Sequence, residues 1–488
     1  MKKNFFILKL LLSLFCFLVS FSAIARPNFI IVLTDDMAVD EFRFMPRTQE
    51  YFAINGVRFT NAFVSQAMCC PARSSILTGQ YSVNTGVKSN NFPTGGWHVF
   101  HELGLESATM AAKLQASGYS TAYFGKFMNE YGLGNQIPRN YVPLGWSDWY
   151  AFVASPSYYN YSLNENGVIK NYGNTPADYA TDVLAKHALN HLNSALNKNS
   201  PFFMLISAYA PHSSTDEAIR PTVPVSAPRH KNLFNGIQAP RSASFNQADV
   251  SKKPFNVQSR PLLSPEDIDW IDLSFRLRIQ SLRSVDEMVG KLIDKLKASP
   301  KFNETYIIFV SDNGFWFGDH RFKFGKGGLY DQSHRVPLAI TGPNVQPGLV
   351  RDDLVINTDL FPTVLNLAGV TVAPKNYDGR SIQPLLESNK RQTTFNRRSF
   401  LIETGQEGRL GIRFDSYAYY ETLQAARTIK ELYDTKLDPD QVYNIADRLT
   451  GTSATAISDA LGQLRNCKAG TCRKLENTFT DDLVQLTN

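Results

Sequence analysis

The segment SQAMCCPARSSILTGQYS (residues 65–82) contains two adjacent cysteines, followed by a proline, a small residue and an arginine. Cys69 and Cys70 are poorly placed to form a disulfide with each other, because that bond requires the two backbones to lie well apart. The small and helix-tolerant residues from Arg73 to Gly79 predict a helix after the pair. The two thiols therefore need an explanation other than a bond between them.

Acidic and amide side chains follow two apolar runs that lie far apart in the chain. Asp35 and Asp36 end the run PNFIIVLTDD, and Asp312 and Asn313 end the run ETYIIFVSDNG. An Asp-Asp pair alone also fits an ordinary strand end or helix cap. Three carboxylates brought together repel one another unless a cation lies among them. Because the ligands are all oxygens, the pattern indicates a calcium or magnesium site.

Basic residues occur in the same kind of position. Lys126 ends the run STAYFGK, Lys326 lies in FGKGGLYDQSHRVPL, and Arg73 follows Cys69 by four residues. A single lysine is usually a solvated surface group. Lysines and an arginine beside a hard cation, however, form a typical site for a tetrahedral oxyanion. The N-terminus of the predicted helix would add backbone N–H donors. These residues predict a site for sulfate or phosphate esters.

Four apolar runs must position these side chains. They are PNFIIVLTDD, STAYFGK, PFFMLISAYAPH, which ends in His212, and ETYIIFVSDNG. Continuous apolar runs of this length are typical of strands buried on both faces, so we expect an α/β fold with a parallel or mixed sheet covered by helices. Ligands of such sheets bind beyond the carboxyl ends of the strands. The four polar ends should therefore meet at one edge.

Helix and loop signals divide the rest of the chain. Ser264-Pro265 predicts a helix start, with an amphipathic run to Leu296, and Thr175-Pro176 predicts another helix. Residues 213–263 read as a long connection of the kind that forms functional loops or lids. After about Pro374, short strands and a helix up to Leu464 predict a smaller C-terminal domain on an antiparallel sheet. We therefore expect a signal peptide (1–25), a catalytic α/β domain (26–374) and a C-terminal α+β domain (375–488).

The N-terminus predicts export. Lys2 and Lys3 precede an apolar stretch that closes with Ala23-Ile24-Ala25, a typical signal-peptide cleavage site. A retained anchor helix is the alternative. Removal of residues 1–25 lowers the formal charge from +6 to +3, which gives no case for nucleic-acid binding, and leaves no membrane span. We expect a secreted or periplasmic protein.

Oxidising conditions along that route also bear on the remaining cysteines. They favour a local disulfide between Cys467 and Cys472 in NCKAGTCRK. A C-x4-C zinc half-site is the alternative, but no second pair of ligands lies near it in the sequence.

The cysteine segment resembles a family signature. Cys69-x-Pro71-x-Arg73, followed by Ser74 and Thr78-Gly79, is similar to the motif of the formylglycine-dependent sulfatases, in which the first cysteine is oxidised enzymatically to formylglycine. The similarity extends over nearly the whole mature chain and implies an alkaline-phosphatase-like fold. The segments FGKFMNEYG, VPLGWSDWYAF, YYNYSLNENG, ETGQEGR and NCKAGTCR look most like the N-acetylglucosamine-6-sulfatases and heparan 6-O-endosulfatases. Cys70 is then the variable second position, and we expect it to be a small buried hydrophobe.

The resemblance implies a mechanism and its residues. One hydroxyl of hydrated formylglycine attacks sulfur, and the second then expels sulfate from the covalent intermediate. Arg73 would stabilise the hydrate, Lys126 and Lys326 would hold sulfate oxygens, and His212 would be the general acid. Asn129 and Glu407 are further substrate-binding candidates. One calcium ion would be held by five residues: Asp35, Asp36, Cys69 in its modified form, Asp312 and Asn313. The implied partners are a formylglycine-generating maturase and a sulfated sugar or glycosaminoglycan.

Two positions depart from the family pattern. Many sulfatases read Gly-Lys-x-His, and Met128 stands here in place of that histidine, so the base for sulfate release is not identified. His320 matches many sulfatases but departs from the glucosamine branch. His187 and His191 lie one helical turn apart without a metalloprotease glutamate, and we interpret them as a solvated or packing pair.

Three other functions are compatible with parts of the pattern. They are a phosphodiesterase or phosphonate monoester hydrolase, a generic arylsulfatase, and a sugar-binding protein with a decayed site. Related phosphorus-ester hydrolases use a second metal site with more carboxylate and histidine ligands than these strand ends provide. The complete set of metal, lysine and histidine positions argues against decay.

Overall fold

A computed structural model describes residues 26–134, 136–214, 223–387, 395–425 and 427–487 of the chain. The expected signal peptide, residues 1–25, lies outside these residues. Within the described part, no helix combines the length and the apolar character that crossing a bilayer requires.

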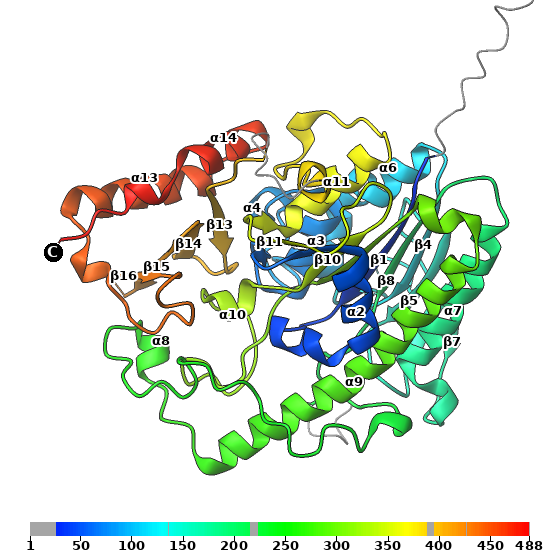
Figure 1. Cartoon of the computed structure of the whole chain (residues 1–488), viewed down its shortest axis with the longest axis horizontal. Coiled ribbons are helices and arrows are strands. Elements are labelled where there is room, and N and C mark those ends of the chain that lie inside the picture. Colours follow the sequence, from blue (N-terminus) through cyan, green and yellow to red (C-terminus); the bar gives the residue numbers. More distant parts are fainter. Residues whose placement is uncertain (1–25, 135, 215–222, 388–394, 426, 488) are drawn as a thin grey trace, which may run out of the picture.

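A large mixed sheet forms the centre of the molecule (Figure 1). Its five middle strands, β9, β1, β8, β4 and β5, run parallel to one another, and the strands next to them on either side, β10 and β6, are antiparallel to them. This confirms the predicted α/β fold with a mixed sheet. In order across the sheet, the ten strands are β11 (Leu349–Arg351), β2 (Gly56–Phe59), β10 (Leu338–Thr341), β9 (Thr305–Ser311), β1 (Asn28–Thr34), β8 (Phe202–Ser207), β4 (Ser120–Gly125), β5 (Asp148–Val153), β6 (Ser162–Glu165) and β7 (Val168–Asn171).

Strand β1 explains why the apolar runs are continuous. Phe29, Ile31 and Leu33 enter the apolar cluster on one face of the sheet, whereas Ile30 and Val32 enter the cluster on the other face. Successive side chains of a strand point to opposite faces, so a strand covered on both sides must be apolar at every position. All seven residues of β1 are buried.

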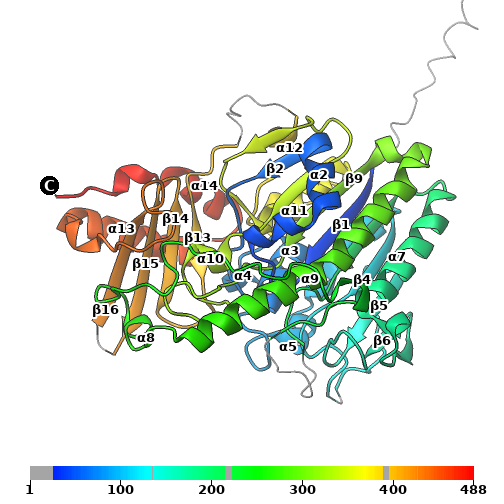
Figure 2. The ribbon, with the colours of Figure 1, turned by 60° about the horizontal axis from the view of Figure 1, so that its bottom comes forward.

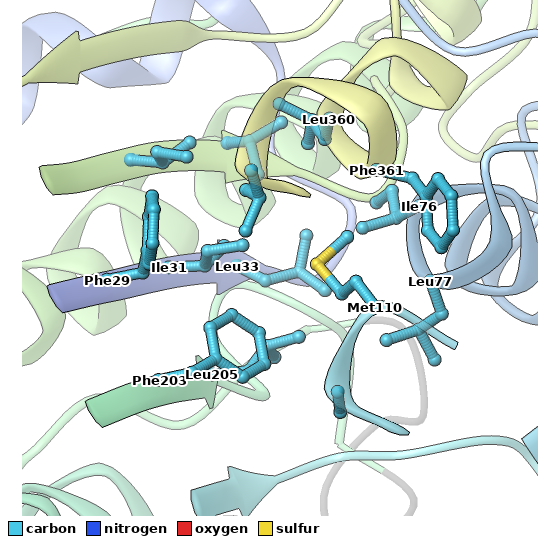
Figure 3. Packing of buried hydrophobic residues seen from close by; sticks show 14 of the residues in the cluster. Phe29, Ile31, Leu33, Ile76, Leu77, Met110, Phe203, Leu205, Leu360 and Phe361 are labelled. Carbon is cyan, nitrogen blue, oxygen red and sulfur yellow. The ribbon is translucent and has the colours of Figure 1, made fainter. Parts of the chain in front are cut away.

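Helices cover both faces. Helices α7 (Ala180–Leu196), α9 (Pro265–Lys297) and α2 (Pro46–Asn55) cover one face, and α3 (Cys69–Thr78), α6 (Met110–Ala116) and α11 (Leu360–Leu367) cover the other (Figure 2). Figure 3 shows the second cluster, where side chains of β1 and β8 pack towards those of α3, α6 and α11. This packing fixes the helix that begins at Cys69.

The predicted helix starts are largely confirmed. Helix α9 begins after Ser264, whose hydroxyl accepts a hydrogen bond from the Asp267 N–H at 3.2 Å. The segment after Thr175 forms only a 3-10 turn, η4 (Pro176–Asp178), and α7 follows from Ala180. An N-terminal proline fits the first turn of either kind of helix, so it did not distinguish them.

A second, four-stranded antiparallel sheet lies beside the large sheet. Its strands are β13 (Ser399–Glu403), β14 (Arg409–Phe414), β15 (Tyr417–Gln424) and β16 (Arg427–Asp434), and α13 (Gly451–Arg465) and α14 (Gly470–Thr478) accompany it. The Cys467–Cys472 disulfide is present between the two helices, as predicted. We propose residue 374 as the end of the catalytic domain; the boundary lies between α11 and β13.

The long connection contacts two parts of the structure: Arg229 pairs with Asp182 of α7 and Glu287 of α9, whereas residues 252–255 contact the second sheet and the segment that follows it. The buried ammonium of Lys253 donates a 2.7 Å hydrogen bond to the Tyr433 hydroxyl and lies 4.6 Å from the centre of the Tyr330 ring. Burial lowers the pKa of Lys253 to about 8. This end of the connection is therefore an anchored part of the structure.

Candidate active site

Four neighbouring strands bring their polar ends to one edge of the large sheet. Strands β9, β1, β8 and β4 are adjacent, and Thr34 of β1 pairs with Ser311 of β9 while Leu33 pairs with Ser207 of β8. The residues that follow these strand ends therefore lie side by side. They are Asp312 and Asn313, Asp35 and Asp36, His212, and Lys126. The first turn of α3 adds Cys69 and Arg73 to the same group.

Cys69 lies at the centre of this group and is 1% exposed. Its Sγ lies 2.8 Å from Lys326 Nζ, 3.2 Å from Lys126 Nζ and 3.4 Å from Asp35 Oδ1. Burial raises the pKa of this thiol to about 12, so at neutral pH it is an uncharged thiol. Two ammonium groups therefore converge on one side-chain position, as an anionic ligand bound there requires.

The group contains a set of atoms suited to a divalent cation. Ligand atoms of Asp35, Asp36, Cys69 and His212 all lie within 4.8 Å of one another. Asp35 Oδ2 is buried and lacks a well-aligned hydrogen bond, although Lys126 Nζ lies only 2.6 Å away. Asp36 has a left-handed backbone (φ 67°), which is uncommon for a residue other than glycine and typical of functional sites. Carboxylate oxygens at this density fit a hard divalent cation.

Asp312 and Asn313 lie against this set but contact it differently. Asp312 Oδ2 accepts a 2.9 Å hydrogen bond from Arg73 Nε, and its Oδ1 accepts one of 2.9 Å from the Asp36 N–H. The Asn313 amide donates to Asp36 Oδ1, and its oxygen lies 3.3 Å from Lys326 Nζ. All five predicted metal-binding residues are therefore neighbours, and Asp312 also pairs with a buried arginine.

The charges of the site stabilise one another. Burial opposes ionisation of Asp35, but Lys126, His212 and Arg73 hold its pKa well below the usual range. Burial and the Asp35 carboxylate raise the pKa of Asp312 to about 6. Burial also opposes the charge of Lys126, yet the Asp35 carboxylate raises its pKa. Three acids and three bases thus face one another in a largely dry site.

His212 is oriented by its own neighbours. Its Nδ1 lies 2.8 Å from the Ser213 carbonyl oxygen and 3.1 Å from the Tyr209 hydroxyl, and its ring stacks on Tyr209. A carbonyl oxygen only accepts, so Nδ1 carries a hydrogen and Nε2 faces Asp36 Oδ2 at 3.6 Å. Burial lowers the pKa of His212. The ring therefore presents Nε2 to the site.

Sequence reasoning missed a buried arginine that supports the site. Arg278 of α9 is 1% exposed and donates to both oxygens of Glu41, at 2.7 and 2.8 Å. The same guanidinium donates to the carbonyl oxygens of Asp36 and Pro211. It thus fixes the backbone at the candidate metal-binding loop and beside His212. Its position in a long amphipathic helix carried no local signal for this contact.

The remaining candidates lie at different distances from this group. Asn129 is partly exposed beside Cys70, with its N–H donating to Cys70 Sγ at 3.0 Å. Glu407 is exposed in the loop between β13 and β14, and among the described residues no hydrogen bond or ion pair joins it to the group. Met128 is buried among apolar side chains. His320 is buried against Gln247 and Tyr330.

The histidine pair of α7 also packs. The ring of His187 stacks on Tyr150 with centres 4.4 Å apart, and His191 packs against Phe124. Glu165 Oε1 lies 3.5 Å from His187 Nε2, and Asp148 Oδ2 lies 3.4 Å from His191 Nδ1. The two side chains thus have separate structural partners.

Comparison with known proteins places the chain among sulfatases. Residues 27–370 match the sulfatase family, and residues 318–466 match the C-terminal region of N-sulphoglucosamine sulphohydrolase. The N-acetylglucosamine-6-sulfatase of Homo sapiens is 33% identical over 489 residues, which cover 92% of this chain and 86% of that protein.

Two solved structures share the fold. One is a complex with its substrate D-glucosamine-2-N,6-O-disulfate; the TM-score is 0.71 at 23% identity, over 92% of this chain and 98% of that chain. The other is a phosphonate monoester hydrolase from Silicibacter pomeroyi, with a TM-score of 0.68 at 19% identity, over 90% of this chain and 94% of that chain. Together with the family match over most of the chain, the alkaline-phosphatase-like fold and the clustered site lead to one assignment: the chain belongs to the sulfatase family and is a sulfuric ester hydrolase.

Proposed function

We propose that the protein is an exported sulfatase that removes the 6-sulfate of N-acetylglucosamine units, with formylglycine made from Cys69 and one bound calcium ion. The observation that carries the proposal is the position of Cys69, at the start of α3 and within 3.2 Å of both Lys126 Nζ and Lys326 Nζ. A host maturase supplies the oxidant for the modification. The N-terminal leader supports export.

Two groups would complete the site. Formylglycine at residue 69, in its hydrated form, would supply the nucleophilic hydroxyl and a second hydroxyl that allows sulfate to be released. Calcium supplies positive charge that offsets the sulfate oxygens and lowers the pKa of the attacking hydroxyl. The ligands that the chain offers are Asp35, Asp36, Asp312, Asn313 and the modified Cys69.

The chain's own residues would then hold the ester and move protons. Lys126 and Lys326 bind sulfate oxygens, since both ammonium groups face the Cys69 side chain. Arg73 contacts both Asp35 and Asp312 through its guanidinium group, and its positive charge stabilises the nucleophile at residue 69. His212 presents Nε2 for protonation of the leaving sugar oxygen. Met128 has a thioether, which does not act as a base, so the proton acceptor for sulfate release is a different group.

The sugar assignment rests on the relatives. The 33% identical human relative is named for N-acetylglucosamine 6-sulfate, and the similarity covers almost the whole of this chain. A site specific for phosphorus esters with two metal ions would need a second group of ligands. Among the described residues, the set Asp35, Asp36, Cys69 and His212 is the one group of three or more His, Cys, Asp and Glu side chains close enough to share an ion. This favours the sulfatase over the two-metal alternative.

Mass spectrometry tests the modification. Trypsin cleaves after Arg58 and Arg73, so protein from its native host should yield the peptide Phe59–Arg73 with an aldehyde in place of the Cys69 thiol. Metal analysis of the same sample should find calcium, and chelation should abolish turnover. Fully active enzyme that contains only unmodified cysteine would refute the formylglycine proposal.

A substrate panel tests the specificity. We expect N-acetylglucosamine 6-sulfate to be cleaved well ahead of 2-O-sulfated uronic acid and 4-O-sulfated N-acetylgalactosamine, because polar groups that fit one sugar are left unpaired by another. Preference for another sulfated sugar would leave the sulfatase assignment and remove the glucosamine assignment. Preference for a phosphonate ester would reverse the choice of reaction.

A further inference from the structure

Residues 88–96 form a loop that contacts the first turn of α3, one residue from the nucleophile position. The Cys70 N–H donates a 2.9 Å hydrogen bond to Asn90 Oδ1, and Cys70 Sγ lies 3.7 Å from the Asn90 carbonyl oxygen. On its other side, Cys70 Sγ accepts the 3.0 Å hydrogen bond from the Asn129 N–H. The buried thiol thus joins two segments, 88–96 and 129–130, to the helix that carries Cys69.

The oxygen end of the Asn90 side-chain amide is used in a hydrogen bond, and among the described residues its nitrogen end forms none. Its Oδ1 accepts from the Cys70 N–H, and this bond identifies which end of the amide faces the helix. The two hydrogens on Nδ2 then point away from that N–H. Asn90 is partly exposed. It therefore offers hydrogen-bond donors at the surface beside the catalytic helix.

Glu130 supplies an acceptor next to the same loop. Its Oε2 accepts a 2.9 Å hydrogen bond from the Phe92 N–H, and the residue is partly exposed. Its backbone is left-handed (φ 68°), which a glutamate rarely adopts. A Cβ at Gly96 would lie 2.4 Å from Glu130 Oε2 and 2.8 Å from the Asn90 carbonyl oxygen. The absence of a side chain at residue 96 thus lets Glu130 and the Asn90 backbone both pack against this residue.

The charge of Glu130 is not accounted for by the fold. Among the described residues, no lysine, arginine or histidine forms an ion pair with it. A carboxylate and an amide on two adjoining segments can bind sugar hydroxyls and acetamido groups, because together they provide acceptors and donors. Asn90 contacts Cys70 directly, and Glu130 follows Asn129, whose N–H donates to Cys70 Sγ, so both lie on segments that contact the residue next to Cys69.

We propose that Asn90 and Glu130 bind the sugar ring of the substrate and help to determine which sulfated sugar is cleaved. Asn90 donates from Nδ2 to a sugar oxygen, and Glu130 accepts from ring hydroxyls or from an acetamido N–H. Cys70 is a positioning residue, since it ties both segments to α3. The identity of the sugar rests on the proposed function; the contact between these residues and the ring does not.

The test uses variants that keep the structural hydrogen bonds. Asn90→Asp retains the oxygen that accepts from the Cys70 N–H but removes the donors, and Glu130→Gln retains the oxygen that accepts from the Phe92 N–H but removes the charge. The measured quantity is kcat/KM for N-acetylglucosamine 6-sulfate divided by kcat/KM for 4-nitrophenyl sulfate. Effects on the shared sulfate site cancel in this ratio. We expect each variant to lower the ratio about tenfold, the loss of one ligand hydrogen bond.

Matched controls separate a specific contact from a general change of charge. Asn91→Asp adds the same charge one residue further along at an exposed position, and Glu102→Gln removes the same charge at the exposed end of α5 (Gly96–Glu102). Both controls should leave the ratio unchanged. An unchanged ratio in Asn90→Asp and Glu130→Gln, or an equal fall in the controls, would refute the proposal.

Two further measurements keep this test independent of the proposed function. If the protein without substitutions prefers another sulfated sugar, kcat/KM for that sugar replaces kcat/KM for N-acetylglucosamine 6-sulfate in the ratio. Calorimetric binding of N-acetylglucosamine 6-sulfate to Cys69→Ala, with and without Glu130→Gln, needs no turnover. Weaker binding on addition of Glu130→Gln supports the contact, and equal binding refutes it.

Discussion

Replacement of Asp312 by alanine should affect both stability and activity, and the structure gives the size of the first effect. Arg73 is 2% exposed and Asp312 is fully buried, and Arg73 Nε donates to Asp312 Oδ2 at 2.9 Å. Removal of one partner from a buried ion pair costs about 3–5 kcal/mol, because the other charge is left without compensation. Asp35 Oδ1 remains 3.6 Å from Arg73 Nη2, so we expect about 3 kcal/mol.

That loss is a large part of the free energy of unfolding, which is about 5–15 kcal/mol for a typical domain. If Asp312 served only as a metal ligand, Asp312→Ala would remove the metal site and leave the fold intact. The buried pair with Arg73 changes this expectation. Asp312→Asn is the better probe of metal binding, since its amide oxygen can still accept from Arg73.

Guanidinium unfolding followed by tryptophan fluorescence, in chelator and again in calcium, measures these effects separately. In chelator, Asp312→Ala should unfold at a clearly lower denaturant concentration than the original protein, and Asp312→Asn should lie between them. In calcium, both variants should lose the stabilisation that the metal provides, and both should lose turnover. If Asp312→Ala matches the original protein in chelator, the buried pair does not contribute as we have reasoned.

Three other predictions concern residues around the site. Arg278→Met should lower kcat, because it leaves the buried Glu41 without its ion-pair partner. The control Arg276→Met, on the same helix, should change kcat little. Equal losses of kcat in the two variants would show that Arg278 does not position the site. Burial raises the pKa of Glu403 to about 7, above its usual value near 4.5. The folded state therefore favours the neutral acid, and the free energy of unfolding should fall as the pH rises from about 4.5 through 7. Glu403→Gln should lack this decline. If the variant and the original protein show the same dependence of the unfolding midpoint on pH, the raised pKa of Glu403 is contradicted. Asn129→Ala and Glu407→Ala should reduce kcat/KM on the sulfated sugar more than on an aryl sulfate; equal losses on both would remove these residues from sugar binding.

The position of the loop 404–408 supports the test of Glu407. Gly405 has a left-handed backbone (φ 69°), and a Cβ there would lie 2.0 Å from the Lys88 carbonyl oxygen. The Gln66 amide donates to the same carbonyl oxygen at 2.7 Å. The C-terminal sheet thus places this loop against the loop 88–96, which contains Asn90.

Most of the catalytic group could be predicted from the sequence because each part of it is a local pattern. Asp35 and Asp36, Lys126, His212, and Asp312 and Asn313 each end an apolar run, and the ends of neighbouring parallel strands must meet at one edge of the sheet. Cys69 and Arg73 lie in one short motif on one helix. The Cys467–Cys472 pairing was also local, with four residues between the two cysteines.

The contacts around that group were decided by tertiary structure. Arg278 reaches the Asp36 carbonyl from a helix 242 positions away, and Asn90 reaches Cys70 from a loop 20 positions away. Neither residue belongs to a periodic pattern or a spaced motif, so nothing in its own segment distinguishes it from a helix arginine or a loop asparagine. Such contacts depend on how helices and loops pack on the finished sheet. Strand order brings the candidate site residues together, whereas this packing orients them and places the loop 88–96 beside the helix that carries Cys69.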